Sequence, residues 1–472
     1  MSRFGKDYGE NYDEVEEKMK SAIYVTVVAI VLSFVLVTST VARPPMLLPR
    51  RGTWDADTIN VESLFSQGDT GEGVHVAVLD TGLVPNWRDY FPSDRIAAHL
   101  GKGFREPVHV DPVSGELVEA GFVEETSWVG STLSSHGTHV TSTIIGYNYY
   151  APADAASGLP LPPLYIEGIA PKATVIPVKV LSTYNLPPYT GPEGLVFGTW
   201  GAVAAGIYYA TELKIQGYSP MVISMSLGGG EPSPEIEISI DYAIANGVIV
   251  VAAAGNDGLE GMDWPGAYPQ VISAGASGWK YEWYWPNLTP PNPPSVPRYR
   301  LWWLQDQTYG FNDIAEPTPA SDVYVTDFSG RENDTRLGFF VDQELDVLAP
   351  GSWVRGPFPG YPSYQHLPWW APGNGWIVAP PNLVNFFYAG GTSMATPHVS
   401  AVAALMLQKN PTLTQAQVEG ILKSTALPVP QNTWMIVFDI SPTLGFYNRT
   451  WGGFEATGSG LIQADAAVAA VP

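Results

Sequence analysis

The sequence contains no cysteine among its 472 residues. This absence excludes a disulfide framework, a metal site built on thiolates and a cysteine nucleophile. It leaves the redox compartment open, because a chain without cysteine suits either side of a membrane.

Positive charge is also scarce. The chain has 23 Lys and Arg residues against 46 Asp and Glu residues, which gives a formal net charge of −23. Nucleic-acid binding requires clustered cations that neutralise phosphates, so we expect no nucleic-acid partner. The acidity instead favours solubility, with a weak attraction for cationic peptides. The length allows one large domain or two ordinary ones.

One long apolar run, residues 22–41, has no charged residue and no proline. About 20 helical residues cross the ~30 Å hydrocarbon layer of a membrane. We therefore predict a transmembrane signal anchor over residues 22–42, after a tail of residues 1–21 and before a linker of residues 43–53. The acidic residues before the run are unlike the basic start of a signal peptide and favour an uncleaved anchor with an extracytoplasmic domain. The alternative is a cleaved signal peptide and a secreted protein, with the cut near Ala42.

The rest of the chain alternates between short apolar runs and longer helical stretches. Near-continuous apolar runs are typical of strands in a parallel sheet that is covered on both faces. The pattern predicts an α/β fold with three layers, α/β/α, and a mainly parallel central sheet. The expected strands lie within residues 73–82, 173–181, 220–229 and 246–256, and the expected helices within residues 198–216, 234–245 and 393–409.

Two stretches rich in proline and aromatic residues interrupt this alternation, near residues 278–319 and 352–387. Neither has a period of its own, so we interpret both as long loop insertions within one domain of residues 54–472.

Three short motifs carry the residue types of nucleophilic catalysis. Asp80 lies in VLDTG at the end of an apolar run, His136 in HGTHV, and Ser393 in GTSMATPHV at the start of the strongest helical stretch. Each residue alone has an ordinary structural explanation, as a turn aspartate, a packed histidine or a helix-capping serine. Together they supply a hydroxyl, an imidazole that removes its proton and a carboxylate that orients the imidazole.

The ordered motifs make the chain similar to the subtilisin-like (subtilase) serine proteases. The resemblance extends from about residue 54 to residue 465 and implies a serine endopeptidase with Asp80, His136 and Ser393 as its triad. It also implies protein or peptide substrates and chemistry that requires no cofactor. The motifs that carry it are VLDTG, HGTHV, GIAPKATVIPVKVL, SMSLGGG, VAAAGN, ELDVLAPG and GTSMATPHV.

The resemblance also implies how the transition state and substrate are held. Asn256, at the end of VAAAGN, would donate to the oxyanion together with the backbone N–H of Ser393. Small residues in the lining favour bulky apolar substrate side chains, whereas Asp257 favours basic ones, and the sequence leaves this choice open. The residues implied to line the main specificity pocket are Ser226, Leu227, Gly228, Gly229, Ala253, Ala254 and Gly255.

Other polar residues in the matched motifs have weaker assignments. Asp89 lies nine positions after Asp80 and resembles a calcium-binding carboxylate of the family, so structural calcium is an expectation. The expected partner loop, residues 148–166, shows no clear ligand pattern. We interpret His139 and His398 as packing residues.

Two other functions compete with the peptidase. A catalytically silent subtilase fold could act as a binding or adhesion module through its aromatic insertions. The joint presence of Asp80, His136, Asn256 and Ser393 argues against this module, which needs none of them. An esterase of the α/β-hydrolase class requires a G-x-S-x-G motif and a different order of triad residues, and Ser393 has neither.

Overall fold

The structure is a computed structural model, and its described residues all lie after the predicted anchor. The tail, the anchor and most of the linker predicted from the sequence fall outside them, so these expectations and the location that depends on them stay predictions. None of the helices in the described residues has the length and apolar character needed to cross a membrane. The described residues are 50–111, 113, 117–131, 134–149, 163–184, 195–280, 303–305, 313–338, 341–359, 364–366, 376–378, 386–430, 434–436, 446–448 and 454–472.

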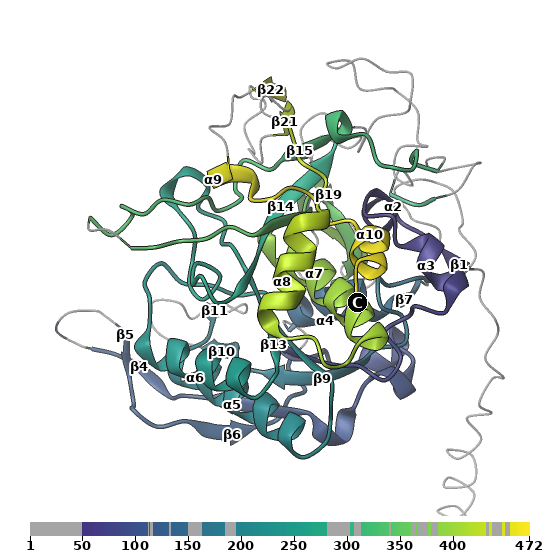
Figure 1. Cartoon of the computed structure of the whole chain (residues 1–472). Helices are drawn as coiled ribbons and strands as arrows, with labels where there is room; N and C mark the ends of the chain where they lie inside the picture. The colour runs from purple at the N-terminus through teal and green to yellow at the C-terminus, as the bar shows by residue number, and fades with distance from the viewer. Residues whose placement is uncertain are drawn as a thin grey trace, which may run out of the picture. The chain divides into compact units, whose positions relative to one another are not determined.

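A nine-stranded mixed sheet forms the centre of the fold, in the spatial order β15-β14-β13-β12-β2-β9-β3-β6, with β16 paired to β14 (Figure 1). Parallel pairs run through its middle, whereas β15 and β6 are antiparallel to their neighbours β14 and β3. The predicted, mainly parallel sheet is therefore confirmed. Its strands are β2 (His75–Asp80), β3 (Lys102–Arg105), β6 (Glu124–Thr126), β9 (Thr174–Lys179), β12 (Met221–Met225), β13 (Ile249–Ala253), β14 (Ile272–Trp279), β15 (Val323–Val325) and β16 (Val347–Pro350).

Both faces of this sheet are buried, which explains the near-continuous apolar runs. In β2, Val76 and Val78 belong to the hydrophobic core that includes residues of α4 and α7. Ala77 and Leu79 belong to a second core, shared with α5 and α6. Because side chains alternate along a strand, each central strand contributes to both cores and separates two helical layers. The helices are α4 (Ser135–Ile145), α5 (Trp200–Ile215), α6 (Pro234–Ala245), α7 (Thr392–Lys409) and α8 (Gln415–Thr425) (Figure 1).

Local sequence explains where several helices begin. The Thr199 side chain accepts a hydrogen bond from Ala202 N at the start of α5, and Pro234 opens α6, where its missing N–H costs nothing. Thr414 and Gln417 form a reciprocal capping box at the start of α8. These caps satisfy backbone donors that the first helical turn leaves without partners.

Smaller elements surround the central layers. The remaining helices are α2 (Trp54–Thr58), α3 (Glu62–Gln67), α9 (Phe454–Thr457) and α10 (Ala464–Ala469), with 3-10 turns at Trp87–Asp89, Ser93–Arg95, Ala98–Leu100, Gly258–Glu260 and Ala320–Asp322. The remaining strands are β1 (Arg50–Arg51), β4 (Val108–Val110), β5 (Leu117–Glu119), β7 (Tyr147–Tyr149), β8 (Leu164–Ile166), β10 (Ser182–Tyr184), β11 (Leu195–Phe197), β17 (Val354–Pro357), β18 (Tyr364–His366), β19 (Trp376–Val378), β20 (Phe386–Ala389), β21 (Trp434–Ile436) and β22 (Phe446–Asn448).

The two predicted insertions fall largely outside the described residues. In the first, Trp303 and Leu304 are buried, and the Trp303 carbonyl accepts a hydrogen bond from Trp54 N at 3.1 Å. The second is bounded by β17 and β20, which pair antiparallel. Residues 303–304 of the first stretch and β17 and β20 at the ends of the second therefore pack on the domain.

Candidate active site

The carboxylate of Asp80 lies at the carboxyl end of β2 and is fully buried. Its Oδ1 accepts a hydrogen bond from Thr81 N at 2.6 Å. The start of α4 approaches closely, because a methyl group on Gly137 would lie 3.0 Å from Asp80 Oδ1 and 2.5 Å from Gly82 O. Glycine at position 137 therefore lets the helix bring its first residues to the end of the strand.

His136 is the second residue of α4 and faces Asp80. Its Nδ1 lies 2.9 Å from both carboxylate oxygens of Asp80. Thr81 also anchors this helical turn, because its Oγ1 accepts from Gly137 N at 2.9 Å and donates to Ser134 O at 3.0 Å. The sequence analysis did not assign a role to Thr81, although its place directly after Asp80 in VLDTG is a usable signal.

The environment of His136 favours its protonated form. Burial lowers the pKa of His136, but the charge of Asp80 and the hydrogen bond to it raise the pKa by more, so that it lies above the ordinary imidazole value. The side chain of His136 is nevertheless 30% exposed, whereas that of Asp80 has no exposure. The arrangement thus combines a buried carboxylate with an imidazole that solvent or substrate can reach.

Ser393 is the second residue of α7 and contacts the end of β12. Its Oγ donates to the carbonyl of Ser226 at 3.2 Å, and Ser226 Oγ donates to the carbonyl of Ser393 at 2.7 Å. Pro397 has no N–H, so the Ser393 carbonyl lacks its usual partner one turn later in the helix. The hydroxyl of Ser226 therefore satisfies a carbonyl that the proline leaves free.

The described residues contain no hydrogen bond between Ser393 and His136. Helices α4 and α7 pack against each other, but the Ser393 hydroxyl is bonded to Ser226 instead. Catalytic hydrogen bonds are often long or poorly aligned without substrate and tighten when substrate binds.

Asn256 follows β13 and is tied to the start of α7. Its Oδ1 accepts from Thr392 N at 2.9 Å and from Thr392 Oγ1 at 3.2 Å. These two bonds fix the carboxamide and leave its NH₂ group to donate elsewhere. Asn256 is exposed. It is hydrogen-bonded to Thr392, the residue that directly precedes Ser393 in the chain. Thr392 thus holds the side chain of Asn256, a contact that was not predicted from the sequence.

The segments expected to line the specificity pocket are held together by backbone hydrogen bonds. Gly229 and Trp264 exchange two of them, at 2.8 and 2.9 Å, and Asp263 N donates to Ala254 O at 2.9 Å. Ser226, Ala253, Ala254 and Gly255 are buried, Leu227 and Gly229 are partly buried, and Gly228 is exposed.

Comparison with known proteins places this site in a family. Residues 71–449 match the peptidase S8 family, described as the subtilase family. The chain belongs to the subtilase family. The matched residues include Asp80, His136, Asn256 and Ser393.

Several curated subtilases are similar over most of the chain. Subtilisin NAT from Bacillus subtilis subsp. natto is 28% identical over 374 residues, which are 78% of this chain and 64% of that protein. Subtilisin from Bacillus pumilus is 28% identical over 78% of this chain and 89% of its own length. Subtilisin BL from Lederbergia lenta is 26% identical over 88% and 97%.

A solved structure supports the fold alone. Fervidolysin from Fervidobacterium pennivorans, described as a keratinolytic enzyme related to subtilisin, matches with a TM-score of 0.51 and 24% identity. The match covers 89% of this chain and 46% of that one. It confirms the subtilisin-like α/β architecture.

The two packing histidines of this subtilase lie deep in the fold. His139 is buried, and its ring Nε2 lies 3.1 Å from the carbonyl of Val354. His398 is also buried, with Nδ1 at 2.8 Å from Met394 O and Nε2 at 3.0 Å from Asp55 Oδ2. Both ring nitrogens of His398 are therefore engaged, as expected of a structural residue.

The expected calcium carboxylate Asp89 is exposed, and its Oδ2 accepts from Asn86 Nδ2 at 3.0 Å. Neither of the two carboxylate groups that could share an ion among the described residues includes it. Most of the expected partner loop lies outside the described residues, so the assignment of Asp89 stays a prediction.

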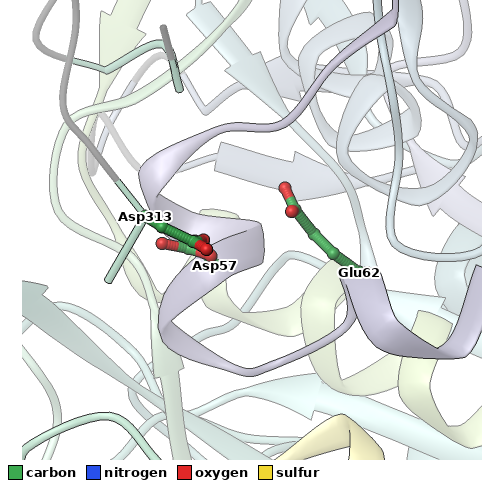
Figure 2. A group of neighbouring side chains, drawn as sticks. All are labelled: Asp57, Glu62 and Asp313. Atoms are coloured by element: carbon green, nitrogen blue, oxygen red, sulfur yellow. The ribbon is translucent and has the colours of Figure 1, made fainter. Parts of the chain in front are cut away.

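The carboxylates that do cluster lie elsewhere. Asp57 from α2, Glu62 from α3 and Asp313 lie within 4.8 Å of one another (Figure 2). Burial raises the pKa of Asp57 to about 8, against the hydrogen bond from Ile314 N, so this group holds a proton at neutral pH. The second cluster, Glu344, Asp346 and Glu419, surrounds the ammonium of Lys423.

Proposed function

We propose that the chain is a serine endopeptidase that hydrolyses peptide bonds through an acyl-enzyme. The chain spans 64% of the length of subtilisin NAT. The observation that carries the proposal is the bond between Asp80 and His136, which leaves the imidazole partly exposed. It is supported by Asn256, held through Thr392 beside Ser393.

Each polar group has a role in the proposed reaction. His136 removes the proton of Ser393 Oγ as that oxygen attacks the scissile carbonyl, and then protonates the leaving amine. Asp80 fixes the imidazole tautomer by accepting from Nδ1 and stabilises the imidazolium. Asn256 Nδ2 and the N–H of Ser393 donate to the oxyanion. A water molecule, activated by His136 in turn, hydrolyses the acyl-enzyme and restores Ser393.

For Ser393 to be deprotonated, its hydroxyl must leave the carbonyl of Ser226 and rotate toward His136. The Ser226 carbonyl is a neutral acceptor on a strand end, so the exchange replaces one hydrogen bond by another and costs little net free energy. The location proposed with this function is membrane-anchored and extracytoplasmic, or secreted after cleavage near Ala42, and it rests on residues 22–41 alone.

A fluorophosphonate probe tests the nucleophile. We expect the wild type to be labelled and Ser393→Ala to lose both the label and peptide turnover, by more than about 10⁴-fold. Ser400→Ala is the matched control, because Ser400 lies on the same helix but its hydroxyl bonds to Ser224 in the core. Folded wild-type protein that takes up no label at Ser393 would instead support the silent binding module.

A further inference from the structure

A short segment, residues 262–264, is inserted between the two stretches expected to line the specificity pocket. Asp263 N donates to Ala254 O, and Trp264 exchanges two backbone hydrogen bonds with Gly229. The segment is thus hydrogen-bonded through its backbone to both stretches.

The carboxylate of Asp263 lies against glycines of both stretches. A methyl group on Gly255 would lie 2.6 Å from Asp263 Oδ2, and one on Gly228 would lie 2.7 Å from Asp263 Cβ and 3.3 Å from Oδ2. The side chain is 16% exposed. The carboxylate of Asp263 therefore lies against both stretches, at positions where glycine leaves room for it.

Arg336 lies outside the two stretches and forms an ion pair with this carboxylate. Its guanidinium lies 3.0 Å from Asp263 Oδ1, pairs with Asp257 Oδ2 as well, and donates to Met262 O at 2.6 Å. The Arg336 side chain is only 13% exposed. A methyl group on Gly230 would lie 3.2 Å from its Nη2. The guanidinium therefore bridges both acidic side chains of this region.

The charges show what Arg336 does here. The pKa of Asp263 is raised to about 6, because burial and the charge of Asp257 raise it by more than the charge and hydrogen bond of Arg336 lower it. With Arg336 in place, one cation is shared by two carboxylates. Without it, two uncompensated carboxylates would face a substrate side chain, which is the arrangement that binds a basic group.

We infer that Arg336 is a specificity-determining residue, which occupies the position that a lysine or arginine side chain of the substrate would need. The inference rests on the proposed peptidase function and decides between the two preferences that the sequence leaves open. The enzyme accepts bulky apolar side chains before the scissile bond. Arg336 excludes basic ones, because it already pairs with the carboxylates that would bind them. Asp257 attracts a basic substrate less strongly than a free carboxylate would, because it already pairs with Arg336.

The test is a panel of fluorogenic peptides that differ only in the residue before the scissile bond: Phe, Leu, Lys or Arg. We expect wild-type kcat/KM to be at least about tenfold higher for Phe and Leu than for Lys and Arg. Arg336→Met keeps an apolar side chain but removes the charge. It should raise kcat/KM for Lys and Arg by about 10- to 100-fold and change that for Phe by less than about threefold.

Three variants serve as controls. Arg336→Lys retains the cation and should keep the wild-type profile. Arg336→Met combined with Asp263→Asn should lose most of the gain for basic substrates. Arg95→Met removes an arginine whose ion pair with Asp94 is exposed and should change nothing. Benzamidine, a small cation, should inhibit Arg336→Met more strongly than the wild type.

The outcomes separate this inference from the proposed function. No turnover of any substrate by folded wild type would overturn both. Turnover with the same profile in wild type and Arg336→Met would overturn the role of Arg336 alone. So would a wild-type preference for Lys or Arg, which decides the question even where Arg336→Met fails to fold.

Discussion

Two pairs of aspartate and histidine in this chain have similar distances and different surroundings. His136 lies 2.9 Å from Asp80, and His398 lies 3.0 Å from Asp55. The His136 side chain is 30% exposed, and only its Nδ1 is bonded to protein among the described residues. The His398 side chain has no exposure, and both of its nitrogens are engaged.

The difference shows that a carboxylate beside an imidazole does not by itself make a catalytic pair. General-base catalysis requires a ring nitrogen that is free to take a proton from the reacting group. His398 has none, because Met394 O and Asp55 take both. The pair of Asp55 and His398 instead connects α2 with α7, so its effect is on stability.

Replacing each histidine with alanine gives the largest contrast between the pairs. His136→Ala should lower kcat/KM by more than about 10⁴-fold with a smaller effect on stability, because water can reach Asp80 through the partly exposed site. His398→Ala should instead cost about 3 kcal/mol of unfolding free energy, because it leaves Asp55 without its partner in the interior. Peptide turnover and urea denaturation of both variants measure the two effects.

The comparison would fail if the roles were exchanged. Folded His398→Ala protein without turnover, or His136→Ala protein with normal turnover, would place the catalytic pair at Asp55 and His398.

A smaller effect is expected at Asn256, which is exposed, whereas Asp55 and His398 are buried. Asn256→Ala should lower kcat by about 10²–10³-fold. This is the magnitude that loss of one oxyanion donor causes in subtilisin, which is a relative of this chain. Thr392→Val keeps the backbone donor to Asn256 Oδ1 and removes only the hydroxyl, so a decrease of a few fold is expected.

The measurement for both variants is steady-state kinetics beside labelling by the probe. An unchanged kcat in Asn256→Ala would remove the oxyanion role. Equal losses in the two variants would show that the hydroxyl of Thr392, rather than the amide of Asn256, is the group that matters.

Much of this fold could be predicted from the sequence, because the signals are local. Parallel strands buried on both faces produce apolar runs, and those runs located β2, β9, β12 and β13 within a few residues. The motifs likewise placed Asp80 at a strand end, and His136 and Ser393 in first helical turns. Each of these positions depends on residues that are neighbours in the chain.

Contacts between distant segments could not be predicted in the same way. Arg336 reaches Asp257 and Asp263 from more than 70 positions away, and nothing in its own neighbourhood indicates this. The pairing of His398 with Asp55 is separated by 343 positions. Such contacts follow from how the layers pack and have no periodic or motif signal.

A pH-dependent effect concerns His139, which is buried and shares α4 with His136 but has no hydrogen-bonded carboxylate among the described residues. The pKa of His139 is lowered to about 4, because burial and the charge of His136 lower it by more than the hydrogen bond to the Val354 carbonyl and the charge of Asp55 raise it. In the unfolded chain the pKa is near 6.5, so between pH 6.5 and about 4 the unfolded state binds the extra proton. Stability contributed by neutral His139 is therefore present above pH 6.5 and is lost as the pH falls through this window, by up to about 1.4 kcal/mol per pH unit.

His139→Gln removes this titration, so the difference in urea midpoint between variant and wild type should shift in favour of the variant as the pH falls from 7 to 4. A difference independent of pH would mean that His139 titrates alike in both states, and that burial alone does not separate it from His136.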